Sequence, residues 1–137
     1  MTLVDSSVLL DMFAGSPEWA SWSKQQLNDA ASRGPVIIND VIYTEISVRF
    51  GTHQEIDSVL HDIRIEVVTM PRAALFLAGK VFSRYRAAGG IRTGVLSDFF
   101  IGAHANVGRL PLLTRDPKRI RNYFPEVELI APGTAGA

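Results

Sequence analysis

Apolar residues along this chain alternate between short continuous runs and longer stretches in which they recur every three or four positions. Continuous runs of aliphatic residues indicate buried strands, whereas the three- to four-residue period indicates helices with one apolar face. The runs predict strands at residues 2–5, 36–38, 65–68, 110–114 and 127–130. Capping residues, proline and glycine delimit the stretches between them. These stretches predict helices from Ser6, from Pro17 to about Gly34, from Asn39 or Asp40 to Phe50, after Thr52, from Pro71 to about Ala88, from Ser97 to about Val107, and over 117–123.

Strands that alternate with helices of these lengths require crossover connections, which make neighbouring strands parallel. We therefore expect an α/β fold of three layers, with helices on both faces of a mainly parallel central sheet of about four to five strands. One domain over residues 1–132 and a loose C-terminal tail over 133–137 fit this pattern, since the chain contains no internal repeat or linker. Ligands of such folds bind beyond the carboxyl ends of the strands.

Composition narrows the range of functions. The chain has 137 residues, is 47% hydrophobic and 20% charged, and contains no cysteine. The absence of cysteine excludes thiolate-bound zinc, iron–sulfur clusters, thiol nucleophiles and disulfides. No apolar run approaches the length of a membrane span, and no signal peptide is visible before Asp5. We expect a cytoplasmic protein that does not bind membranes.

The charges are unevenly distributed, although the formal net charge is zero. Acidic residues dominate up to Glu66, whereas residues 67–125 contain only two, Asp98 and Asp116, among ten of the fourteen lysines and arginines. A basic surface around two isolated acids suits an enzyme that acts on a polyanion. A solvated basic face is an equally good interpretation of the charges alone.

Four acids are candidates for chemistry, and three of them have an alternative role at a helix start, two as caps and one as a charge that complements the helix dipole. Asp5 precedes a helix, Asp116 precedes a proline that can open one, and Asp98 falls in a first helical turn, where a negative charge is favourable. Glu45 instead lies within the apolar face of its helix, so it requires a partner. The alternative for Glu45 is an ion pair, for which its own helix offers only Arg49.

Convergence of these four acids in one pocket would require a cation, because neighbouring carboxylates raise each other's pKa and destabilise the fold. Oxygen ligands without cysteine or clustered histidine suit Mg²⁺ or Mn²⁺. Such an ion beside a basic surface suggests metal-assisted hydrolysis of a phosphodiester. His53, His61 and His104 are far apart in the sequence and are interpreted as ordinary helix residues.

Several segments, taken together in order and spacing, resemble the PIN-domain nucleases, and within them the VapC-type toxins of bacterial toxin–antitoxin pairs. The resemblance covers nearly the whole chain. It rests on Val4-Asp5-Ser6-Ser7-Val8-Leu9-Leu10-Asp11, on Glu45, on Asp98-Phe99-Phe100-Ile101-Gly102-Ala103-His104, on Leu112-Leu113-Thr114-Arg115-Asp116-Pro117 and on Tyr123-Phe124-Pro125.

The resemblance implies an endoribonuclease that depends on Mg²⁺, for which Mn²⁺ can substitute. Its acidic positions match Asp5, Glu45, Asp98 and Asp116, of which Asp5 and Asp98 are the expected metal ligands. Two further positions, Ser7 and Thr114, match hydroxyl residues that support the site.

The family also implies a homodimer, an RNA substrate and a cognate antitoxin protein that covers the site. Trp19 and Trp22 could form an aromatic contact surface or belong to the core. Basic residues near the glycine-containing segment 89–94 are expected to contact RNA phosphates, whereas Asp11 is expected to lie outside the site. These basic residues are Lys80, Arg84, Arg86 and Arg92.

Three other functions are alternatives to this one. A phosphoacceptor domain of the receiver type should show an acidic pair after its first strand and a lysine after a later one, and neither is present. A DNA nuclease on the same fold usually carries extra segments that hold a duplex. A non-catalytic nucleic-acid-binding module stays open because fold alone does not fix function, but all four acids are present.

Overall fold

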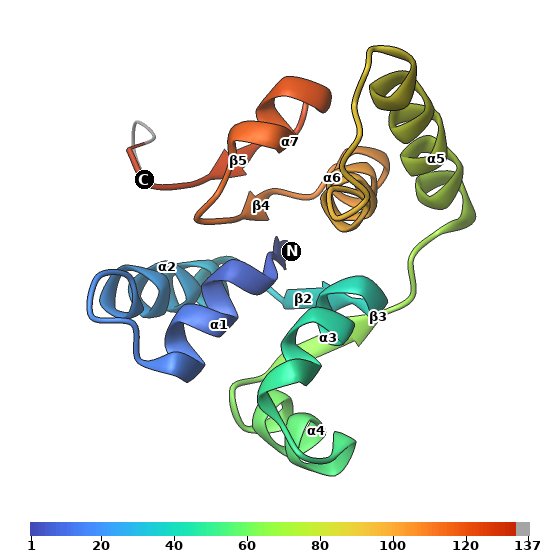
Figure 1. The fold of residues 1–137 in the computed structure, drawn as a ribbon. Coiled ribbons are helices and arrows are strands. Elements are labelled where there is room, and N and C mark those ends of the chain that lie inside the picture. Colours follow the sequence, from blue (N-terminus) through green and yellow to red (C-terminus); the bar gives the residue numbers. More distant parts are fainter. Residues whose placement is uncertain (134–137) are drawn as a thin grey trace.

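Strands and helices alternate along the described chain, residues 1–133 of a computed structural model (Figure 1). Most of the expected tail over 133–137 therefore lies outside the described residues. The five strands are β1 (Thr2–Val4), β2 (Val36–Asn39), β3 (Ile65–Val68), β4 (Leu112–Leu113) and β5 (Leu129–Ile130). The helices are α1 (Ser6–Ala14), α2 (Ala20–Arg33), α3 (Asp40–Ile46), the 3-10 turn η1 (Ser47–Arg49), α4 (His53–Asp62), α5 (Arg72–Ala87), α6 (Leu96–Gly108) and α7 (Lys118–Tyr123).

The five strands form one sheet in the order β3-β2-β1-β4-β5, and every neighbouring pair is parallel. This confirms the predicted α/β class with a parallel central sheet. The chain runs from β1 outward through β2 to β3 and then returns to place β4 on the other side of β1. The strand order therefore reverses between β1 and β4, and a crevice opens beyond the carboxyl ends of such strands.

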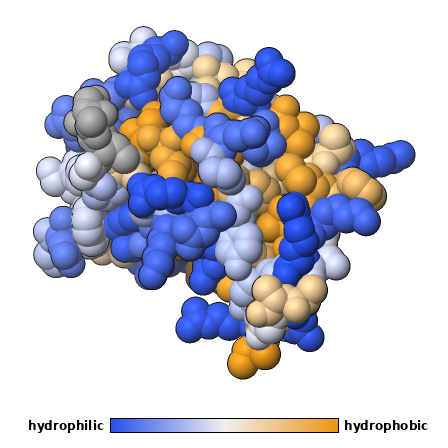
Figure 2. All heavy atoms as spheres, turned by 90° about the horizontal axis from the view of Figure 1, so that it is seen from above, coloured by the Kyte–Doolittle hydropathy of each residue, from blue (hydrophilic) through white to orange (hydrophobic). Residues whose placement is uncertain are grey.

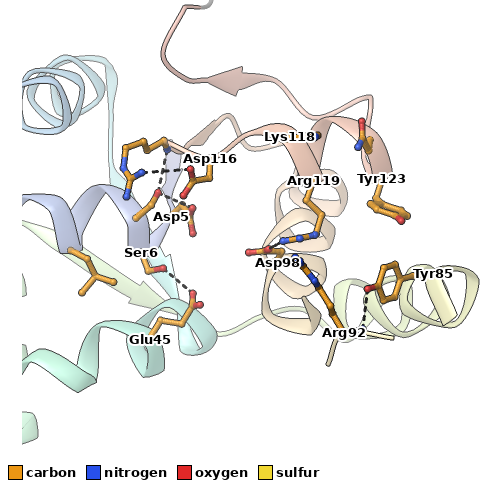
Figure 3. Close-up of a pocket in the computed structure, with 14 residues that line it drawn as sticks. Asp5, Ser6, Glu45, Tyr85, Arg92, Asp98, Asp116, Lys118, Arg119 and Tyr123 are labelled. Carbon is orange, nitrogen blue, oxygen red and sulfur yellow. Dashed lines mark hydrogen bonds and ion pairs between the residues drawn. The ribbon is translucent and has the colours of Figure 1, made fainter. Parts of the chain in front are cut away.

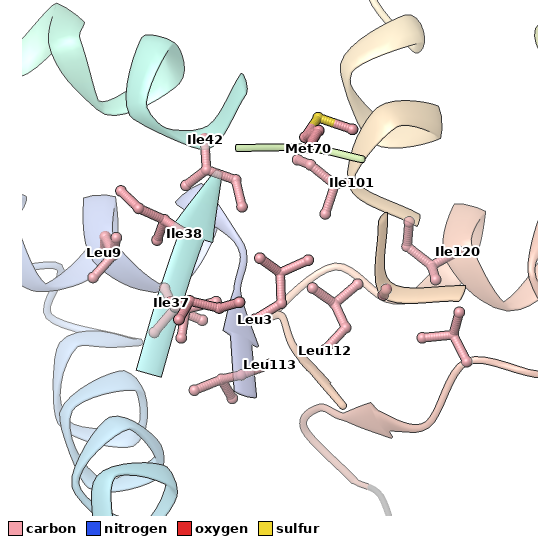
Figure 4. Packing of buried hydrophobic residues seen from close by; sticks show 14 of the residues in the cluster. Leu3, Leu9, Ile37, Ile38, Ile42, Met70, Ile101, Leu112, Leu113 and Ile120 are labelled. Atoms are coloured by element: carbon pink, nitrogen blue, oxygen red, sulfur yellow. The ribbon is translucent and has the colours of Figure 1, made fainter. Parts of the chain in front are cut away.

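Helices cover both faces of the sheet, giving three layers, with α1 packed on α2 and α5 packed on α6 (Figure 1). The side chains of Leu3, Val4, Leu112 and Leu113 are fully buried, as expected for central parallel strands that are covered on both faces. Figure 4 shows these strand residues packed with isoleucines from the surrounding helices. This core holds β1 and β4 side by side and so fixes the crevice at their ends.

Close contact between α6 and α7 depends on Gly102. A Cβ atom at this position would lie 2.4 Å from the ring of Phe124 and 3.1 Å from Ile120. Only glycine lets the two helices approach to this distance. The fit brings the N-terminal half of α6 and the whole of α7 to the same end of the sheet.

Most predicted caps and boundaries are confirmed, with differences at helix ends. Asn39 accepts a hydrogen bond from the backbone N–H of Ile42, and Thr52 caps α4 through the N–H of Glu55. The predicted cap at Ser97 is wrong, because α6 already begins at Leu96 and has no side-chain cap.

Other differences concern length. The strand expected over 110–114 pairs only at Leu112–Leu113, and α2 begins at Ala20, three residues after Pro17. The helix expected to reach Phe50 becomes a 3-10 turn after Ile46. Within residues 1–133, no helix is both long and apolar enough to cross a membrane.

Candidate active site

A cavity of about 880 Å³ opens at the carboxyl ends of β1 and β4, where the strand order reverses (Figure 3). It is lined by residues of α1, α3, α5, α6, α7 and the loops beside them. These residues are Asp5, Ser6, Ser7, Leu10, Glu45, Tyr85, Arg92, Asp98, Arg115, Asp116, Lys118, Arg119, Asn122 and Tyr123. All four acids singled out from the sequence therefore face one cavity.

Asp5 directly follows β1, and its carboxylate is held by two hydroxyl groups. Oδ2 accepts hydrogen bonds from Ser7 Oγ at 2.9 Å and from Thr114 Oγ1 at 2.7 Å. The pairing of Val4 with Leu113 brings Thr114 beside Asp5. Asp5 occupies the N-cap position of α1 but makes no capping bond, so the capping alternative is wrong here.

Burial raises the pKa of Asp5, and the charge of Asp98 raises it further, although the hydroxyls of Thr114 and Ser7 counteract both effects. Folding therefore buries part of the Asp5 side chain and places another negative charge nearby.

Glu45 reaches the same cavity from α3. Ser6 Oγ donates a hydrogen bond of 3.0 Å to its Oε1 (Figure 3). Burial raises the pKa of Glu45, the bond from Ser6 opposes this, and the charges of Asp5 and Asp98 raise it again. Within residues 1–133, Glu45 forms no ion pair, so the alternative pairing with Arg49 is not realised.

Asp98 lies in the first turn of α6 and is bound by Arg119 of α7. Arg119 Nη1 donates to Asp98 Oδ2, and about a third of each side chain is exposed. No sequence pattern predicts this ion pair, because its partners come from separate helices. Asp98 does lie near the start of its helix, where a negative charge is favourable, but this position does not explain its ion pair with Arg119.

Asp116 lies at the rim of the cavity, with 71% of its side chain exposed. It is not a helix cap, because α7 begins at Lys118 after an N-cap at Pro117. Its nearest cation is Arg115, whose Nη1 lies 3.6 Å from Asp116 Oδ1.

Arg115 is fixed from behind by Asp11. The Nε of Arg115 donates to Asp11 Oδ2 at 2.7 Å, and Ser23 Oγ donates to the same oxygen at 3.2 Å. The ring of Trp19 lies 5.5 Å from the Arg115 guanidinium carbon. Asp11 does not line the cavity, as expected, but it positions a residue that does.

The basic side of the cavity differs from the expected one. Of the four basic residues predicted to contact RNA, only Arg92 lines the cavity. Lys80, Arg84 and Arg86 are exposed on α5 outside it, so their contact with RNA stays a prediction. The other cationic residues that line the cavity are Arg115, Lys118 and Arg119, which follow β4 in the chain. Figure 2, a view of the molecule from above Figure 1, shows a largely hydrophilic surface with apolar groups between the hydrophilic side chains.

Two further expectations concern the histidines and tryptophans. His104 is buried, its Nδ1 lies 3.1 Å from Asn39 Nδ2, and burial lowers its pKa. It therefore ties α6 to the end of β2 rather than being an ordinary helix residue. Trp19 and Trp22 are both half-buried and contact each other edge to face, with Trp22 packed on the core.

The donor set fits a divalent cation. Four carboxylates face one cavity, and Asp5 and Glu45 have raised pKa values and no cation partner within residues 1–133. Oxygen ligands of this kind are those that Mg²⁺ and Mn²⁺ prefer. Among the described residues no three acidic or histidine side chains form a complete metal site, and Asp98 is occupied by Arg119. Arg119 binds only Oδ2 of Asp98, so the second carboxylate oxygen, Oδ1, is available to a cation.

The cavity at the strand switch of this parallel α/β fold is lined by acids together with cationic side chains, an arrangement typical of enzymes that act on anionic substrates. The chain matches the PIN-domain family over residues 2–124 and belongs to this family of nucleases. No curated protein matches the chain.

Several solved structures share the fold. One is VapBC2 from Rickettsia felis bound to a promoter DNA fragment, with 18% identity, TM-score 0.69 and coverage of 95% of this chain and 97% of that one. Another is a toxin–antitoxin complex from Klebsiella pneumoniae, with 22% identity, TM-score 0.63 and coverage of 96% and 98%. A third is FitAcB from Neisseria gonorrhoeae, with 17% identity, TM-score 0.63 and coverage of 95% and 96%.

Proposed function

We propose that this chain is a metal-dependent endoribonuclease and the toxin of a VapC-type toxin–antitoxin pair. One observation carries the proposal: the acids Asp5, Glu45, Asp98 and Asp116 share a cavity with four cationic side chains. Membership of a nuclease family and the fold shared with toxin–antitoxin complexes support it. The RNA substrate, the ion Mg²⁺ and the cytoplasmic location belong to this proposal.

The acids have different roles in the proposed reaction. Asp5 and Asp98, whose charges interact, would hold the ion, and Glu45 and Asp116 in the same cavity would act on water and substrate (Figure 3). When bound, the ion activates a water molecule and neutralises charge on the attacked phosphate. The hydroxyls of Ser7 and Thr114 keep the Asp5 carboxylate oriented toward the cavity.

The raised pKa of Glu45 suits it to accept a proton from the attacking water. Lys118 and Arg119 lie where a phosphate chain would pass, and their charges offset its repulsion by the acids. Arg119 is bound to Oδ2 of Asp98 in this structure, so an ion held by Asp98 would lie close to this guanidinium charge.

Cleavage assays on purified protein test the proposal. Single-stranded RNA, single-stranded DNA and duplex DNA of one sequence are incubated with Mg²⁺, Mn²⁺ or EDTA, alongside the Asp5→Asn variant. We expect cleavage of RNA alone, in either metal, by the parent only. Cleavage of DNA would indicate the alternative PIN-fold DNA nuclease, and binding without cleavage would indicate a non-catalytic nucleic-acid-binding module.

The toxin assignment needs a cellular test. Induced expression should arrest growth and leave new RNA ends at defined positions, and Asp5→Asn should abolish both effects. A cognate antitoxin should restore growth and bind the purified chain. The homodimer is tested by light scattering of the free chain, for which a mass of 15.0 kDa would indicate a monomer.

A further inference from the structure

Two tyrosine rings line the end of the cavity that the proposed reaction does not use. Figure 3 shows Tyr85 and Tyr123 on one side of the Asp98–Arg119 pair, with Asp5 and Glu45 on the other side. Acids, cations and aromatic rings thus follow one another along one cavity.

Packing fixes both rings. The Tyr123 ring centroid lies 5.0 Å from that of Phe99, a fully buried residue, and the Tyr85 centroid lies 5.6 Å from the same ring. The two tyrosine centroids are 6.2 Å apart and their rings are nearly perpendicular. Neither ring needs to be ordered when a ligand binds, which lowers the entropy that binding costs.

The loop after α5 closes on Tyr85. The backbone N–H of Arg92 donates to the Tyr85 hydroxyl at 3.1 Å, and the N–H of Gly90 donates to its carbonyl at 2.9 Å. A Cβ atom at Gly90 would lie 2.4 Å from the Tyr85 ring, so only glycine fits there. This loop covers Tyr85, whereas Tyr123 keeps 36% of its surface exposed beside the cavity. Tyr123 is therefore the ring that a ligand can contact.

Polar groups surround the exposed ring. Asn122 also lines the cavity, is exposed, and its amide makes no hydrogen bond to any residue among 1–133. Arg92, Lys118 and Arg119 supply positive charge in the same cavity. A flat ring, a free amide and several cations are the groups that bind a base and its phosphates together.

We propose that this end of the cavity is a subsite for an unpaired nucleobase, which stacks on Tyr123 next to the phosphate that is cut. This proposal rests on the proposed function and specifies in addition where one base of the RNA substrate binds. Stacking on a tyrosine ring accepts any base, because every base has a π face. A base within a duplex is already stacked and paired, so the subsite selects single-stranded segments of RNA.

A binding experiment in EDTA, where metal-dependent cleavage is absent, isolates the base from the phosphate chain. The probes are a labelled single-stranded RNA octamer and an abasic octamer with the same backbone charge. We expect the protein to bind the RNA about 5- to 100-fold more tightly than the abasic chain, the range expected for stacking of one base. Tyr123→Phe should keep this preference.

Tyr123→Leu should abolish the preference and leave the salt dependence of binding unchanged. Leucine retains apolar contact with Phe99 but has no ring, and a thermal melt checks that the variant is folded. Phe76→Leu is the matched control, because Phe76 is an exposed aromatic residue of α5, 68% exposed, outside the cavity. This control should bind as the parent does.

Three results would overturn the subsite. Equal binding of both probes by the parent would leave a phosphate-binding cavity without a base subsite. Full preference in a folded Tyr123→Leu variant would show that the base contacts something else, and loss of the preference in Phe76→Leu would place the base outside the cavity. Failure to bind either probe would instead contradict the proposed function itself.

Discussion

Replacement of Asp98 by asparagine separates a metal ligand from a residue that only complements its helix. The change keeps the size of the side chain and removes its charge. In the metal-free protein the loss of the Arg119 ion pair should cost about 0.2–1 kcal/mol, because both partners are partly exposed. Removal of a charge that raises the pKa of Asp5 and Glu45 acts in the opposite direction. The free energy of unfolding should therefore change by less than about 1 kcal/mol.

Activity and metal response should change far more. Cleavage of RNA should fall by on the order of 100-fold or more, the scale of losing one preorganised charge in an active site. The parent should gain about 2.7 kcal/mol of stability at a Mn²⁺ concentration of 100 times its dissociation constant. Asp98→Asn should show little of this gain.

The assay combines cleavage of a labelled RNA with thermal melts in EDTA and in increasing Mn²⁺. Asp40→Asn is the matched control, because Asp40 also lies in the first turn of its helix but outside the cavity. It should lose only the helix-dipole contribution, about 0.3–1 kcal/mol, and keep full activity. Near-parental cleavage by a folded Asp98→Asn variant would refute the carboxylate mechanism.

Three further predictions concern the surroundings of the acids. Folding raises the pKa values of Asp5 and Glu45, so the folded protein binds their protons more tightly than the unfolded chain does. The stability that this contributes is fully present below the pKa values of the unfolded chain. It is lost as the pH rises through the pKa values of the folded protein. Denaturant unfolding in EDTA should therefore show that the free energy of unfolding of the parent falls relative to that of Asp5→Asn as the pH rises from 4 to 7. Parallel curves of stability against pH for the two proteins would contradict this. Asp11→Asn should lower the free energy of unfolding by about 1–3 kcal/mol, because its carboxylate is buried and accepts two hydrogen bonds; an unchanged urea midpoint would be inconsistent with that role. Arg119→Gln should bind Mn²⁺ about 1.4- to 5-fold more tightly, since the Asp98–Arg119 pair that it removes contributes about 0.2–1 kcal/mol, and should lower the salt slope of RNA binding by about one. Calorimetry with Mn²⁺ and binding at several salt concentrations measure both effects, and weaker Mn²⁺ binding would show that Arg119 does not compete with the ion.

The positions of Asp5 and Asp116 near strand ends could be predicted because they depend on local sequence. Each follows a short run of apolar residues, and such runs mark buried strands wherever they occur. Parallel crossovers then place the carboxyl ends of the strands at one edge. Glu45 could be singled out for a related reason, since a charge on an apolar helix face requires a partner.

The capping alternatives show where local reasoning ended. Asp5 and Asp116 both have neighbours typical of helix caps, yet neither side chain caps a helix. The Asp5 carboxylate is instead held by two hydroxyl groups, those of Ser7 and Thr114. Asp116 instead lies exposed at the rim of the cavity. A capping motif reflects only the local preference of a residue. In this structure, contacts with residues distant in the sequence replace the expected capping bonds.

The order of strands and helices along the chain and the choice of the four acids follow from local sequence, because apolar periodicity and strand-end positions are local properties. Tertiary packing, by contrast, selects the cations that reach those acids and the rings that face the cavity. The Asp98–Arg119 pair joins residues 21 positions apart, and the Asp11–Arg115 pair joins residues 104 positions apart. Such contacts depend on how helices pack across the sheet, and close packing at one glycine, Gly102, sets the position of α7. Packing acts between segments distant in sequence, so no local pattern records it.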